Sequence, residues 1–153
     1  MASYMPTLAL RGLNTGKIVV GTDVFKVALI TSAIPTTTTR DNTTETYGGA
    51  DFTEHAATGN YSTGGAGITL SEAQYVTGGV HHSAVAASGP TTSWNNVTLA
   101  AVTGAILYDT TPATKYVMAC YDFGGSQSVT ANTFTINWTD TTPNYRVWYL
   151  SAA

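Results

Sequence analysis

The chain has 153 residues, 29 of which are threonine, and only 10% of its residues are charged. A net charge of −3 provides no positive surface for DNA or RNA, so we expect no nucleic-acid partner. Cys120 is the single cysteine, which excludes a disulfide within the chain, and no apolar run is long enough to span a membrane. The first residues lack the basic and apolar regions of a secretory signal, so we expect the protein to be made and kept in the cytoplasm.

Threonine favours strands because its β-branched side chain packs well on a pleated surface. A chain of this length can bury a core without cross-links, and we expect residues 1–153 to form one domain. The composition therefore predicts an all-β protein that acts through its surface rather than through an active site.

The elements are expected in the following order along the chain. A short helix is predicted at 6–13, because Pro6 suits a helix start and leucines follow it. Short turns separate the last strands and favour antiparallel pairing, which predicts an antiparallel β-sandwich or a jelly-roll-like arrangement. Alternating or continuous apolar runs predict strands at 17–20, 24–31, 68–85, 105–108, 116–123, 133–138 and 145–150.

The segment 32–67 differs from the rest because it consists mostly of Thr, Gly, Asn, Asp and Ser. Loops of this length in compact domains are usually functional, so we expect an extended surface loop or arm. Tyr47, Phe52 and Tyr61 are large aromatic residues within it, and such groups commonly anchor protein interfaces. These three residues are predicted to bind a partner.

No group of polar residues has the spacing of a known catalytic or metal site. His81 and His82 are adjacent, so on a strand they point to opposite faces and cannot chelate one metal together. The acidic residues of 41–54 lack the ligand pattern of a calcium loop. Cys120 lies in an apolar run, where a buried thiol is inert. We expect no enzymatic activity, no cofactor and no bound metal.

Five short motifs, each built from strand and turn residues, occur in order along the chain. The motifs are FKVALITS at 25–32, YSTGG at 61–65, AILYD at 105–109, YDFGG at 121–125 and FTINW at 134–138. Together they resemble a group of small virion structural proteins of tailed bacteriophages, over roughly residues 17–151. This resemblance implies a head or tail protein without catalytic residues.

Together, the composition and the resemblance predict a capsid decoration, or cement, protein that binds the outer surface of the major capsid protein shell and stabilises it. Many weak contacts repeated over a symmetric shell add up through multivalency. We expect a homo-oligomer, preferably a trimer, on the capsid surface of a virion assembled in the host cytoplasm. A tail or head-fibre component and a carbohydrate-binding adhesin module stay open as alternatives.

Overall fold

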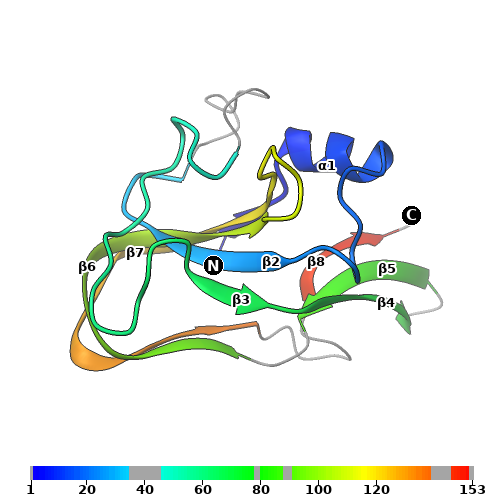
Figure 1. The fold of residues 1–153 in the computed structure, drawn as a ribbon. Helices are drawn as coiled ribbons and strands as arrows, with labels where there is room; N and C mark the ends of the chain where they lie inside the picture. The colour runs from blue at the N-terminus through cyan, green and yellow to red at the C-terminus, as the bar shows by residue number, and fades with distance from the viewer. Residues whose placement is uncertain (1, 35–45, 78–79, 88–90, 139–145, 152–153) are drawn as a thin grey trace.

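The computed structural model describes residues 2–34, 46–77, 80–87, 91–138 and 146–151 (Figure 1). These residues confirm an all-β, antiparallel protein with a short N-terminal helix. The finer expectation of a β-sandwich or jelly-roll-like arrangement stays a prediction. The elements are β1 (Ala2–Tyr4), α1 (Thr7–Asn14), β2 (Phe25–Ile30), β3 (Ala66–Ile68), β4 (Leu70–Thr77), β5 (Val80–Ala87), β6 (Thr91–Asp109), β7 (Val117–Asn137) and β8 (Arg146–Ser151).

The described strands form two antiparallel sheets. One sheet has the order β1-β7-β6-β2-β3, and the other has the order β4-β5-β8. The hairpin of β6 and β7 dominates the first sheet, with Ala105 opposite Tyr121 and Trp94 opposite Phe134. β2 joins only the second half of β6, from Gly104 to Asp109.

Two long strands replace several shorter predicted ones. The break expected between the predicted strands at 116–123 and 133–138 is wrong, because β7 continues from Val117 to Asn137. Gly124 instead has a φ of 74°, and the pairing between β6 and β7 shifts register at several places. Such irregularities are β-bulges, which bend a strand without ending it. The predicted strand at 17–20 is also wrong, because the amides of Lys17 and Ile18 bond to the Gly12 carbonyl in a turn.

The bend of β6 and β7 creates the main core. Both strands curve at one end of the molecule, so their two halves lie in two layers (Figure 1). Aromatic contacts join the layers, since the rings of Tyr121 and Trp138 have centroids 5.2 Å apart. In the first half of β6, Trp94, Val97 and Leu99 are buried between exposed neighbours. Period-two burial of this kind is expected where one face of a strand meets a core.

β2 is buried on both faces. Val27 and Leu29 point into the main core, while Ala28 and Ile30 belong to a second apolar cluster on the opposite face. That second cluster includes Phe52, which comes from the predicted polar arm. The arm residues therefore cover one face of the sheet.

Candidate functional site

The structure places the three predicted partner-binding aromatics against the sheet instead of on an exposed arm. Phe52 is 7% exposed and Tyr61 is 1% exposed. Tyr47 is half-buried and stacks on Tyr108 with ring centroids 4.1 Å apart and planes within 5°. The expectation of a surface arm is wrong at Phe52 and Tyr61, because Phe52 packs in the cluster of Ala28 and Ile30 and Tyr61 packs in the main core. Partner binding by the three aromatics stays a prediction.

The polar segment is attached to β2 by its backbone. The amide of His55 bonds to the Leu29 carbonyl, and the amide of Thr31 bonds to the Thr53 carbonyl, each at 2.9 Å. These bonds continue along β2 beyond the part that β3 pairs with. Residues 46–65 are thus part of the folded body, while 35–45 lie outside the described residues.

Glu54 is the centre of a hydrogen-bond network within this segment. Its Oε1 accepts from the Tyr61 hydroxyl at 2.7 Å and from the Gly64 amide at 2.6 Å. Its Oε2 accepts from the Tyr47 hydroxyl at 2.5 Å. The Tyr108 hydroxyl donates to the Gly64 carbonyl at 2.8 Å. One carboxylate therefore satisfies three donors from separate turns of the segment.

The tyrosines of this network are held in their protonated form. Burial, followed by the hydrogen bond to Glu54, raises the pKa of Tyr47 and of Tyr61 far above the ordinary tyrosine value. Burial and the charge of Glu54 raise the pKa of Tyr108 to about 12. Protonated phenols serve Glu54 as hydrogen-bond donors, so the network stabilises the segment.

Asp109 is a buried carboxyl at the end of β6. Its Oδ1 accepts from the Thr111 amide at 2.8 Å, whereas its Oδ2 has no hydrogen-bond partner among the described groups. Burial raises the pKa of Asp109 to about 6, and the neighbouring Asp23 carboxyl contributes to the rise. The folded protein therefore binds this proton more tightly than the unfolded chain does.

This shift predicts that Asp109→Asn stabilises the protein at high pH. The stabilising effect of the proton is fully present below the pKa of the unfolded carboxyl and is lost as the pH rises through about 6. Asparagine keeps the acceptor for the Thr111 amide but cannot ionise. We expect urea unfolding to show a gain of about 1–3 kcal/mol at about pH 8 and little gain at about pH 4. An equal effect at both pH values would contradict this assignment.

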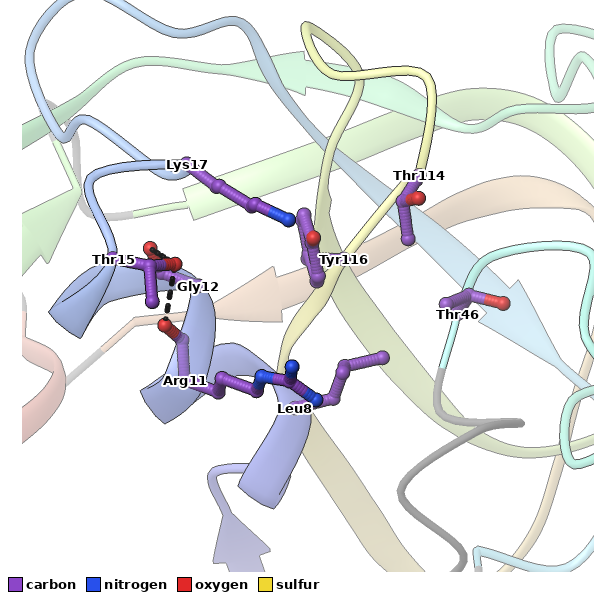
Figure 2. A pocket seen from close by; sticks show the side chains of 8 residues that line it. All are labelled: Leu8, Arg11, Gly12, Thr15, Lys17, Thr46, Thr114 and Tyr116. Carbon is purple, nitrogen blue, oxygen red and sulfur yellow. Dashed lines mark hydrogen bonds between the residues drawn. The ribbon is translucent and has the colours of Figure 1, made fainter.

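A pocket of about 330 Å³ opens between α1, the turn after it and the connection from β6 to β7 (Figure 2). Two cations line it, Arg11 and Lys17, together with the hydroxyl-bearing residues Thr46, Thr114 and Tyr116, and none of its described lining residues is acidic. Figure 2 shows Lys17 extending towards Tyr116, while the two threonines face them from the other side. Sequence reasoning missed this pocket because its residues come from three distant segments.

Backbone contacts set the shape of this pocket. A bridge between Thr46 and Tyr116, and a 2.9 Å bond from the Tyr47 amide to the Lys115 carbonyl, hold the two walls together. Gly12 lets α1 approach the next turn, since a Cβ there would lie 2.5 Å from Cδ1 of Ile18. The helix and the connection are therefore closely packed around the pocket.

A second surface is formed by 91–103 of β6 and 123–137 of β7, which we call the uncharged ribbon. Neither segment contains an Asp, Glu, Lys or Arg. Among the described strands, β1 and β2 pair only with the other halves of β7 and β6, so the β7 edge of the ribbon has no neighbouring described strand. The β6 edge is approached by the segment 55–59, since the Ala100 amide donates to His55 Nε2 and a Cβ on Gly59 would lie 2.2 Å from the Asn96 carbonyl oxygen. Its outer face is exposed and carries Thr91, Ser93, Asn95, Thr98, Thr133, Thr135 and Asn137.

Hydroxyl groups bond to one another across this outer face. Ser93 Oγ lies 2.9 Å from Thr135 Oγ1, and Thr133 Oγ1 donates to Asn95 Oδ1 at 3.0 Å. The charge-free stretches in the sequence were the signal that could have located this surface, once the two strands were known to be paired.

The cysteine and the histidines considered as candidate site residues lie in the following places in the structure. Cys120 is buried, as predicted. The His55 ring bonds to the Ala56 carbonyl at 2.7 Å and accepts from the Ala100 amide at 3.2 Å. Of His81 and His82 the structure describes only the backbone, in β5. Within the described ranges, no group of three or more His, Cys, Asp or Glu is arranged to hold a metal ion.

None of the described helical residues form a segment with the length and apolarity required to cross a bilayer.

Comparison with known proteins gives no match to this chain among protein-family models, curated proteins or solved structures.

Proposed function

We propose that this protein is a virion decoration subunit that binds the outer surface of a capsid shell through the uncharged ribbon. The observation that carries the proposal is the ribbon itself, which has a hydroxyl-rich face, a β7 edge without a neighbouring described strand, and not a single charged side chain. The sequence resemblance to small phage virion proteins supports the same assignment.

The physical argument concerns what an exposed strand edge normally requires. Soluble proteins protect such edges with charges, prolines, bulges or a covering element, because unpaired amides and carbonyls attract other strands. The ribbon has bulges but no charge. Charged residues are also depleted in the buried parts of protein interfaces. A surface of this kind is suited to being covered by a protein partner.

The partner in this proposal is the major capsid protein, and the subunit is a homo-oligomer, with a trimer preferred. Weak contacts by hydroxyl and backbone groups become strong when several linked subunits bind one symmetric shell. The described aromatic side chains favour this role over an adhesin with an aromatic platform. Each Phe, Tyr and Trp whose side chain is described is buried or half-buried.

A charge placed on the outer face tests the proposal. Thr135→Lys puts an ammonium group at the centre of the ribbon, and desolvating it against a shell should weaken binding by about tenfold or more. Binding is measured by sedimentation with phage capsid shells that lack this protein. Thr69→Lys is the matched control, because Thr69 is also exposed but lies between β3 and β4.

The outcomes separate the two parts of the proposal. If the unaltered protein does not bind such shells or raise their rupture temperature, the decoration role is rejected. Should Thr135→Lys and Thr69→Lys bind as well as the unaltered protein, the ribbon is not the contact surface. Urea unfolding of both variants checks that the fold is intact.

A further inference from the structure

We propose that the pocket beside α1 is a binding site for an acidic sugar unit, a ligand that combines one carboxylate with several hydroxyl groups. This site is independent of the uncharged ribbon. It involves α1, the turn that follows it, Thr46 and the connection between β6 and β7, and none of these residues belongs to the ribbon.

The first step of the argument is the charge of the pocket. Arg11 and Lys17 both line it, although the whole chain has only six Lys and Arg and a net charge of −3. In the part of the chain that the structure describes, no ion pair with an acidic side chain is found for either residue. Two cations that share a concave surface with no carboxylate among its described lining residues favour an anionic ligand. Arginine in particular can donate two parallel hydrogen bonds to a carboxylate.

The second step is the chemistry of the other lining groups. Thr46, Thr114 and Tyr116 bring hydroxyls to the pocket, and among the described residues the hydroxyls of Thr46 and Thr114 have no hydrogen-bond partner. A hydroxyl can both donate and accept, whereas guanidinium and ammonium groups only donate. The pocket can therefore pair with ligand hydroxyls in either direction while the cations pair with an acid group.

The third step is size and shape. A volume of about 330 Å³ falls within the range of small-molecule sites, and it is larger than a single inorganic anion requires. Leu8 and the ring of Tyr116 add apolar surface beside the cations, as Figure 2 shows. A sugar ring has apolar C–H faces as well as polar edges, so an acidic monosaccharide matches all three kinds of lining group.

The chain also contains a matched control for charge. Lys115 lies between two lining residues in sequence, but its Nζ lies 5.3 Å from the centroid of the Tyr47 ring and is not part of the lining. Replacing Lys115 by Gln changes the net charge by the same amount as replacing Arg11 or Lys17. A purely long-range electrostatic effect would affect all three variants alike.

The experiment is a titration of the ¹⁵N-labelled protein followed by NMR, with methyl glucuronoside, methyl glucoside and inorganic phosphate as probes. We expect the glucuronoside to shift amide signals of 8–17 and 114–116, with a dissociation constant in the millimolar range. Arg11→Gln and Lys17→Gln should each weaken binding by about tenfold, since each removes a charge-assisted hydrogen bond. Thr114→Val should weaken binding about threefold, and Lys115→Gln should change it by less than about twofold.

Two results would overturn the proposal. One is the absence of glucuronoside-dependent shifts in 8–17 and 114–116 at tens of millimolar ligand. The other is equal binding of inorganic phosphate and glucuronoside with no effect of Thr114→Val, which would show an anion site that does not recognise a sugar. Arg11 and Lys17 are exposed, so their variants should fold normally. Neither result affects the capsid-binding test, because that test probes a different surface.

Discussion

Replacing Gly65 by Ala should destabilise the protein by more than about 4 kcal/mol, or prevent folding altogether. Gly65 has a φ of 68°, and a Cβ added there would lie 1.8 Å from the Val27 carbonyl oxygen. The contact is with backbone, so no rotation of a side chain can relieve it. Gly65 immediately precedes β3, which pairs with β2. Moving Gly65 away from Val27 would therefore separate β3 from β2.

Gly48→Ala is the control for this prediction. Gly48 also has a positive φ, of 84°, but an added Cβ would meet nothing within 4 Å. Its substitution should cost only the backbone strain of about 1–2 kcal/mol. Urea unfolding followed by tryptophan fluorescence measures both variants. Equal losses of stability in Gly65→Ala and Gly48→Ala would show that Gly65 does not lie against the Val27 carbonyl.

The sequence was sufficient to predict the fold class, the N-terminal helix and the inner strands. Residues 27–30 and 105–108 consist of continuous apolar residues, because their strands are buried on both sides of the sheet. A run of this kind is bounded by clear turn residues and is easily recognised. The burial of Cys120 followed from the same reasoning.

The sequence was insufficient where local chemistry and tertiary contacts disagree. Gly124 and Gly125 have the composition of a turn, yet the pairing of Val129 with Leu99 keeps β7 in one strand. Phe52 and Tyr61 stand among polar residues, and nothing in their sequence neighbours shows that Phe52 covers one face of β2 and Tyr61 the other. The need for that cover arises only after β2 has been placed between β3 and β6.

The two candidate sites differ in how far the sequence alone could have predicted them. The sequence contains the two charge-free segments of the uncharged ribbon. That they form one surface could be recognised only from the pairing of 91–103 with 123–137. The pocket was not visible, because Arg11, Thr46 and Thr114 are far apart in sequence and share no motif. Spacing can reveal a site on one helix or one loop, whereas a site assembled from three segments needs the fold.

The Glu54 network has the second large expected effect, and Glu54→Ala should cost about 3–5 kcal/mol of unfolding free energy. This substitution leaves the hydroxyls of Tyr47 and Tyr61 and the amide of Gly64 without their acceptor. A buried donor without a protein or water partner lowers the free energy of unfolding by its full desolvation free energy. The loss should be seen in urea unfolding and in faster proteolysis within 46–65.

Two controls determine whether the network, and not simply a surface charge, is responsible. Glu54→Gln keeps the shape of the side chain and one carbonyl oxygen, so its cost should be about 1–2 kcal/mol. Glu72→Ala removes an exposed carboxylate from β4 and should change stability by less than about 0.5 kcal/mol. If Glu54→Ala were no more costly than Glu72→Ala, residues 46–65 would be held by their aromatic contacts alone. The ordering Glu54→Ala, Glu54→Gln, Glu72→Ala follows directly from the number of buried donors that each variant leaves unpaired.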